Sequence, residues 1–166
     1  MTTVLRRLGL GLLCSAGCVQ VSEDEHADRM AYAETLGTYV GTIAVELEKG
    51  RDALSCDGEL TLDVVAVDLT SLSIDGLGTC SPDAGTGDFV DVLDGDYTYV
   101  ISGESSPGGP ASGAVGGQED PDALTWSGDL SAGEPSKIDG SFSGRVDFLG
   151  IKSVNVVGAF SAARED

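Results

Sequence analysis

The chain has 166 residues with 28 acidic and nine basic side chains, so its formal net charge is −19. This length suffices for one domain and not comfortably for two. The charge excludes nucleic acid as a partner, because that binding depends on Lys and Arg neutralising phosphates, and it also disfavours anionic lipid headgroups. A single histidine, His26, excludes Ser-His-Asp and Cys-His catalytic groups and His-based metal clusters.

The first segment has the pattern of a secretory signal. Arg6 and Arg7 precede an uncharged, largely apolar run over 8–17. A cationic start and a short apolar stretch direct export, while a spanning helix needs about twenty apolar residues. We therefore predict that residues 1–17 are a signal peptide.

The run ends in Ser15-Ala16-Gly17-Cys18, which resembles the lipobox of bacterial lipoproteins. The resemblance implies that Cys18 becomes the mature N-terminus and carries diacylglycerol and palmitate, which would hold the protein to a lipid bilayer. Val19 stands where Asp commonly signals inner-membrane retention, so the resemblance implies export to the bacterial outer membrane or cell surface. The alternative is an ordinary signal cut near Gly17 that leaves Cys18 a free thiol.

Residues 18–36 are predicted to be a lipidated acidic tether with a short helix. Ser22 and Glu25 have the spacing of a capping box. Good helix formers follow, and Gly37 provides a stop. The spacing predicts a helix over about 23–35.

From residue 37 to residue 164 we predict a single all-β domain. Apolar and polar side chains alternate with period two along several segments, which is typical of a strand with one buried face. Strict alternation indicates antiparallel sheet. The inward positions are predicted to include Tyr39, Ile43, Val45, Leu47, Leu60, Leu62, Val64, Tyr97, Tyr99, Ile101, Leu124, Trp126, Leu130, Ile138, Phe142, Val146, Phe148, Val154, Val156 and Phe160.

The turn signals divide this domain into eight or nine strands of an antiparallel meander, closing as a small barrel or a sandwich. Asp94-Gly95 predicts a hairpin between strands at 89–93 and 96–101. The Gly-, Pro- and Ser-rich run 105–117 reads as a long loop with at most a weak strand, and 119–122 and 133–136 read as turns.

Glycines recur beside aromatic residues on the same predicted face, as in Gly37-Thr38-Tyr39-Val40-Gly41 and Gly140-Ser141-Phe142-Ser143-Gly144. Inward glycines make room for a neighbouring ring and let strands coil tightly. A barrel lined in this way can leave a cavity.

Two cysteines, Cys56 and Cys80, lie within the predicted domain. In an oxidising compartment we expect them to form a disulfide. A metal pair is the competing interpretation, which the lack of nearby histidine disfavours.

No cofactor is predicted, and the sequence does not indicate an enzyme. A carboxylate pair acting on glycans is the residual catalytic hypothesis, and the abundance of acidic residues makes it uninformative. Asp83, Asp88, Asp91, Asp94 and Asp96 could ligate calcium, although ordinary turns explain them. Trp126 is expected to pack in the core rather than to stack on a ligand.

Two functions follow. The first is a non-enzymatic envelope lipoprotein with a structural or interaction role and an unknown envelope or extracellular partner. The second is a small barrel that binds an apolar ligand, lipocalin-like by architecture only. A filled interior favours the first, and an apolar cavity of at least ~300 Å³ favours the second.

Overall fold

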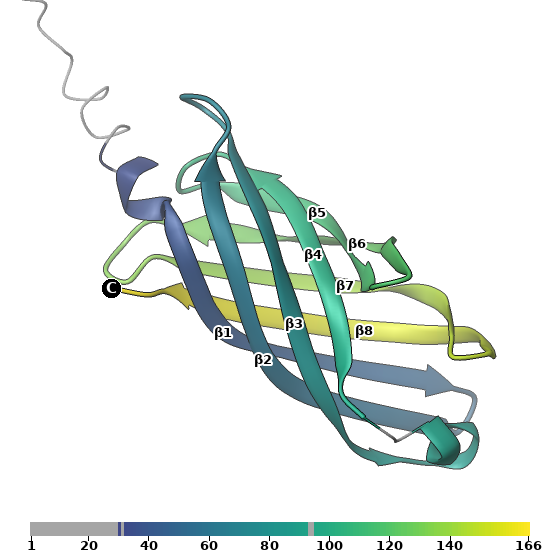
Figure 1. The fold of residues 1–166 in the computed structure, drawn as a ribbon. Helices are drawn as coiled ribbons and strands as arrows, with labels where there is room; N and C mark the ends of the chain where they lie inside the picture. The colour runs from purple at the N-terminus through teal and green to yellow at the C-terminus, as the bar shows by residue number, and fades with distance from the viewer. Residues whose placement is uncertain (1–29, 31, 93–94) are drawn as a thin grey trace, which may run out of the picture.

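A computed structural model describes residue 30, residues 32–92 and residues 95–166. Eight antiparallel strands form one closed barrel in which each strand pairs with its neighbours in the chain and β1 closes against β8 (Figure 1). The strands are β1 (Gly37–Lys49), β2 (Asp52–Ala66), β3 (Leu72–Gly85), β4 (Tyr97–Ser105), β5 (Pro110–Gly117), β6 (Asp120–Ser131), β7 (Lys137–Phe148) and β8 (Ile151–Arg164). The predicted all-β antiparallel meander is confirmed, and it is a barrel rather than a sandwich.

The period-two pattern decides which side chains fill the barrel. In β1, Ile43, Val45 and Leu47 are buried, and the residues between them are exposed. β2 shows the same alternation from Leu54 to Val64. Outward positions of these strands are mainly Thr, Ser, Asp and Glu, so one sheet separates an apolar interior from an acidic outer wall.

One prediction about the joints is wrong, and in a second the strand that the sequence left open is present. Residues Gly87–Val92 form a 3-10 helix, η1, rather than a strand, and its Phe89 is fully buried. Residues Pro110–Gly117 form β5 rather than a loop, because both β4 and β6 supply backbone partners for them. The turn predicted at 119–122 is shorter than expected, since β6 begins at Asp120.

One end of the barrel, here called the capped end, carries the connections at 67–71, 106–109 and 132–136 and a helical turn at 32–35. The Tyr39 hydroxyl donates to the carbonyl of Thr35 (2.8 Å), and burial raises the pKa of this phenol. Ser136 Oγ and the Arg164 guanidinium both donate to the carbonyl of Glu34. These bonds hold the helical turn against the ends of β1, β7 and β8. The rest of the predicted helix lies outside the described residues.

The half of the barrel next to the capped end is filled with side chains. Trp126 is 2% exposed, its indole N–H donates to the carbonyl of Ser102 (2.9 Å), and its ring meets Phe160 edge to face with centroids 5.1 Å apart. Trp126 therefore packs in the core, as the sequence indicates.

Two glycine–aromatic pairs explain the glycines beside the rings. Gly140 lies opposite Phe160, and Phe142 lies opposite Gly158, in the β7–β8 register. A Cβ at Gly140 would lie 2.2 Å from the Phe160 ring, and one at Gly158 would lie 2.2 Å from the Phe142 ring. Each glycine makes the space that the opposite ring occupies, as the sequence predicts.

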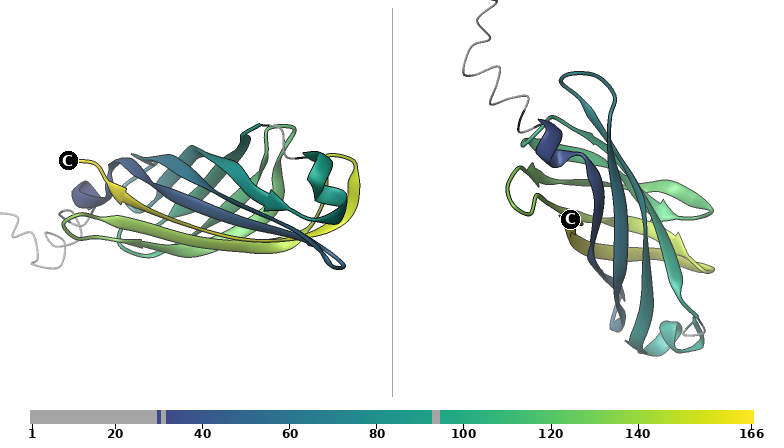
Figure 2. Two further views of the ribbon diagram at one scale, coloured as in Figure 1. Left: turned by 90° about the horizontal axis from the view of Figure 1, so that it is seen from below. Right: turned by 60° about the vertical axis from the view of Figure 1, so that its left-hand side comes forward.

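The opposite end, here called the far end, holds η1 and the β1–β2, β5–β6 and β7–β8 turns (Figures 1 and 2). Toward this end β6 and β7 separate. Their pairing runs from Ser131–Lys137 to Trp126–Phe142 and stops there, although β6 begins at Asp120 and β7 continues to Phe148. Figure 2 (right) shows the β5–β6 and β7–β8 hairpins diverging toward their tips.

Candidate ligand-binding cavity

A cavity of about 820 Å³ lies where β6 and β7 separate. Its walls come from β4, β5, β6, β7 and β8, with Leu47 of β1 also contributing. An eight-stranded barrel is just wide enough either to be filled by its own side chains or to hold one small molecule. This barrel is filled by its own side chains near the capped end and leaves an open space near the far end.

The inner wall of the cavity is apolar and aromatic. It consists of Leu47, Val115, Leu124, Phe142, Val146, Phe148 and Val156. Most of these side chains are the inward residues of their strands, so the same alternation that builds the core also lines the cavity. The space exists because the β6 and β7 backbones diverge, and no side chain of the described residues fills it.

Leu124 lies at the point where the two strands part. A Cβ added at Gly144 on β7 would come 2.4 Å from a methyl group of Leu124. The Leu124 side chain thus reaches toward β7 and occupies the space beside Gly144, which has no side chain. It is a partly buried apolar group in the lining of the cavity.

Tyr97 and Tyr99 form one side of the cavity. The Tyr97 and Phe148 rings are tilted, with centroids 5.3 Å apart, so β4 and β7 meet across the cavity through this pair. Burial raises the pKa of the Tyr99 phenol to about 12, with a smaller contribution from the neighbouring Tyr97. Tyr99 is therefore a neutral hydrogen-bonding group at physiological pH.

Charged residues surround the mouth. Asp96, Glu119, Asp120 and Asp147 contribute carboxylates to the lining, and Arg145 contributes one guanidinium. Asp147 accepts from Lys152 Nζ (2.6 Å) and from the Ser153 backbone N–H (3.0 Å), and these contacts lower the pKa of its carboxyl. Arg145 Nε donates to the neutral amide oxygen of Asn155 (2.8 Å).

The β7–β8 turn brings an apolar residue to the same mouth. Leu149 and Gly150 have φ angles of 46° and 87°, and they form a two-residue connection between Phe148 and Ile151. Positive φ at both positions is typical of a type I′ turn, which favours Asn-Gly. Leu149 is 64% exposed and lines the cavity, so an unfavourable turn residue places an alkyl side chain at the entrance.

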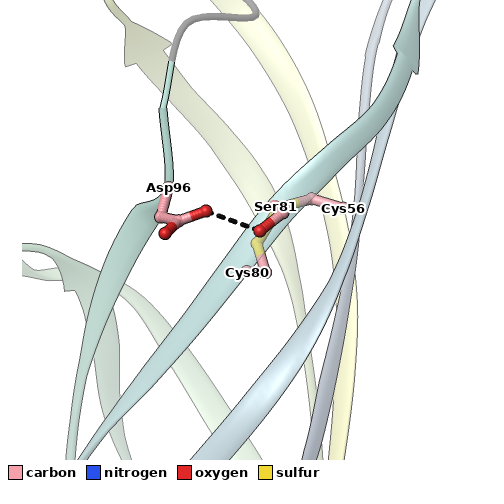
Figure 3. Close-up of a disulfide and its surroundings, with 4 residues drawn as sticks. All are labelled: Cys56, Cys80, Ser81 and Asp96. Carbon is pink, nitrogen blue, oxygen red and sulfur yellow. Dashed lines mark hydrogen bonds between the residues drawn. A yellow bond between two sulfur atoms is a disulfide. The ribbon is translucent and has the colours of Figure 1, made fainter.

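The disulfide predicted between Cys56 and Cys80 is present, with the two Cα atoms 5.5 Å apart (Figure 3). It joins β2 to β3 inside the barrel, and both cysteines are buried. Cys80 is paired in register with Tyr97, so the disulfide fixes β3 next to β4, the strand that contributes Tyr97 to the cavity lining. Next to it, Ser81 Oγ donates to Asp96 at the start of β4 (2.5 Å). Disulfides of this kind form and persist in oxidising compartments.

The remaining site predictions gain no support or refutation. Cys18, His26 and Asp94 lie outside the described residues, as do the signal peptide at 1–17 and most of the tether at 18–36. Within the described residues, no three His, Cys, Asp or Glu side chains gather in a way that could hold a metal ion. The helices in this part of the chain are all too short or too polar to span a membrane.

Comparison with known proteins yields structural likenesses only. No family model and no curated protein matches the chain. Among solved structures, EF1p2_mFAP2b bound to DFHBI is 13% identical with a TM-score of 0.45, over 81% of this chain and 97% of that one. A redesigned beta barrel, b11L5F_LGL, is 12% identical with a TM-score of 0.41, over 82% of this chain and 96% of that one. The class of the protein is therefore defined by its own geometry, as a small antiparallel barrel with a cavity at one end.

The sequence indicates that such a barrel can leave a cavity, and it predicts several of the lining residues without predicting where the cavity lies. Tyr97, Tyr99, Phe148 and Val156 were all expected to point inward, and they do border the interior. Pro121, which the sequence analysis assigns to a turn, also bears on where β6 and β7 separate. Proline has no N–H to donate, so it favours a strand position without a partner, and Pro121 lies in the part of β6 that does not pair with β7.

Proposed function

We propose that this protein binds an apolar small molecule in the far-end cavity. The observation that carries the proposal is the size and lining of the space: about 820 Å³ against apolar and aromatic side chains, with Tyr99 as a partly buried polar group. Small-molecule sites are typically concave, of roughly 300–1,000 Å³, mostly apolar and provided with a few polar groups. A barrel with a purely structural role has no need of such a space.

A neutral apolar fluorophore, N-phenyl-1-naphthylamine, provides the test. We expect its emission to rise and saturate at one molecule per chain. Val146→Trp places an indole in the cavity and should abolish the signal, and Val156→Phe should weaken it. Ser143→Trp is the matched control, because Ser143 is exposed on the same strand and does not line the cavity. Equal binding to the Val146→Trp and Ser143→Trp proteins, both folded by circular dichroism, would contradict the proposal.

We also propose that the barrel is an exported, lipid-anchored protein of the bacterial outer membrane or cell surface. The support is the lipobox resemblance at Ser15-Ala16-Gly17-Cys18, together with a disulfide that fits an oxidising compartment. Radiolabelled palmitate supplied to expressing cells should enter the protein and should not enter the Cys18→Ala variant. Labelling that survives the substitution would remove the anchor from this proposal.

The alternative is an envelope lipoprotein whose role is purely structural or interaction-mediating. Native mass spectrometry of the protein taken from its own envelope distinguishes the two functions, because a ligand-binding barrel should carry a small molecule in addition to its acyl chains. A chain that carries acyl groups alone, and that also fails to bind the fluorophore, would favour the structural role.

A further inference from the structure

The far-end cavity also indicates the chemical class of its ligand, provided that the proposed binding function holds. We infer that the cavity takes an amphiphilic cation, an apolar body that carries an ammonium or similar group, rather than a fatty acid or another anion. The inference depends on how charge and aromatic rings are distributed around the cavity.

First, the buried and the exposed parts of the cavity lining differ in polarity. The inner wall is formed by side chains such as Leu47, Phe142 and Val156, and the charged residues stand at the mouth. A ligand that matches both regions has an apolar part and a polar or charged end. The buried part cannot carry the charge, because removing an unpaired charge from water is costly.

The second step is the sign of the charge at the mouth. The lining holds four carboxylates and one guanidinium, and an excess of negative charge remains even after Lys152 pairs with one of these carboxylates, Asp147. Lys152 already pairs with Asp147, and at the same end of the barrel Lys49 pairs with Asp88 (2.9 Å). Glu119 and Asp120, by contrast, make no side-chain hydrogen bond or ion pair with the described residues. An anionic ligand head would lie close to these carboxylates, whereas a cationic head would find them available.

The third step is the aromatic wall beside the mouth. Tyr97, Tyr99 and Phe148 come from β4 and β7 and line the same cavity. Faces of aromatic rings attract cations, and aromatic walls are a recurring way of recognising quaternary ammonium groups. Because burial raises the pKa of Tyr99 to about 12, this ring stays a neutral phenol and adds a hydroxyl rather than a charge.

Three ligands with the same alkyl chain isolate the effect of charge: decyltrimethylammonium, decanoate and 1-decanol. All are used below the concentrations at which they form micelles, with purified full-length protein and isothermal titration calorimetry. We expect the ammonium to bind about tenfold more tightly than decanoate at low salt, and the difference to shrink as salt screens the mouth. Decanol should fall between the two.

Two double variants locate the effect. Glu119→Gln with Asp120→Asn should weaken ammonium binding several-fold and leave decanol binding unchanged. Asp129→Asn with Asp139→Asn makes the same change in net charge at exposed positions of β6 and β7 outside this cavity, and should leave all three affinities unchanged. If both double variants weaken ammonium binding equally, the net charge of the protein rather than the mouth is responsible, and the inference is wrong.

The outcomes separate this inference from the proposed function. If decanoate binds as tightly as the ammonium or more tightly, while decanol and the fluorophore still bind, the cavity binds apolar ligands and the charge inference is overturned. If none of the three alkyl ligands nor the fluorophore binds, the proposed function itself fails.

Discussion

At the scale of single residues, burial decides whether a polar group helps or harms the barrel. Trp126 satisfies its only donor on the Ser102 carbonyl while filling the barrel beside Phe160. Tyr39 does the same at the capped end through the Thr35 carbonyl. Both rings are buried without leaving an unsatisfied hydrogen-bonding group, which is the condition for large amphipathic side chains in a core.

Tyr99 makes stability depend on alkaline pH. Its pKa is about 12 in the folded protein and about 10 in the unfolded chain. Between these values the unfolded state loses the phenol proton and the folded state keeps it. Stability is therefore fully present below pH 10 and falls as pH rises toward 12, by about 2 kcal/mol from this residue.

The Tyr99→Phe variant should show a flatter decline of unfolding free energy over this pH range than the parent protein. Urea unfolding at a series of pH values, followed by Trp126 fluorescence, measures it. In an absorbance titration at the phenolate band, the variant should also lack the tyrosine whose pKa is about 12. An unchanged decline would mean that Tyr99 is not protected from solvent in the folded state.

At the scale of elements, alternation predicted the strands whose two faces differ in composition. β1, β2, β7 and β8 follow the expected inward residues because Leu, Val, Ile and Phe alternate there with polar residues. β5 has the composition of a loop, and it is a strand because β4 and β6 pair with it from both sides. Such pairing is non-local, so local propensity could not reveal it.

The position and size of the cavity were beyond the sequence for the same reason. Its existence depends on where β6–β7 pairing stops, at Trp126 and Phe142, and β7 keeps its alternating pattern beyond that point. Periodicity specifies which face of a strand is inward. It does not specify how far along its length the strand stays paired with its neighbour. The size of the space therefore required the structure, although several of its lining residues, such as Phe142, Phe148 and Val156, were predicted to point inward.

The β7–β8 turn is expected to trade stability for function. Leu149→Asn should stabilise the protein by about 1 kcal/mol, because a branched side chain at positive φ is unfavourable and Asn-Gly suits this turn. The same change should weaken fluorophore binding, since Leu149 is part of the cavity lining. Urea unfolding and fluorescence titration measure the two effects.

Gly150→Ala gives the opposing comparison in the same turn. It keeps Leu149 in place and puts a side chain where φ is 87°, so it should lower stability and retain binding. A Leu149→Asn protein that is less stable than the parent would show that the leucine contributes packing that outweighs its backbone cost.

At the scale of the whole molecule, one covalent link supports the half of the barrel that contains the cavity. Replacing both cysteines, Cys56→Ala with Cys80→Ala, should lower the free energy of unfolding by about 3 kcal/mol, because the bridge closes a sequence separation of 24 residues. Urea unfolding of the parent protein with and without reductant should reproduce the difference. Identical midpoints for the parent and the double variant would contradict the estimate.

The two halves of the barrel are also expected to differ in their dynamics. The half next to the capped end has continuous pairing and a filled interior, whereas β6 and β7 lack mutual hydrogen bonds over 120–125 and 143–148. Local opening is cheapest where backbone hydrogen bonds are few. Entry of a ligand therefore requires less reorganisation between these segments than at any fully paired pair of strands.

The helical turn at 32–35 leads into β1 at the capped end (Figure 2, left), and the lining residues place the cavity at the far end. A lipid on Cys18 would hold the molecule from the side of its N-terminus. The proposed binding site, at the opposite end of the barrel, would then face the surrounding aqueous space instead of the bilayer. Such a protein would capture or hand over its cargo in solution without leaving the membrane that carries it.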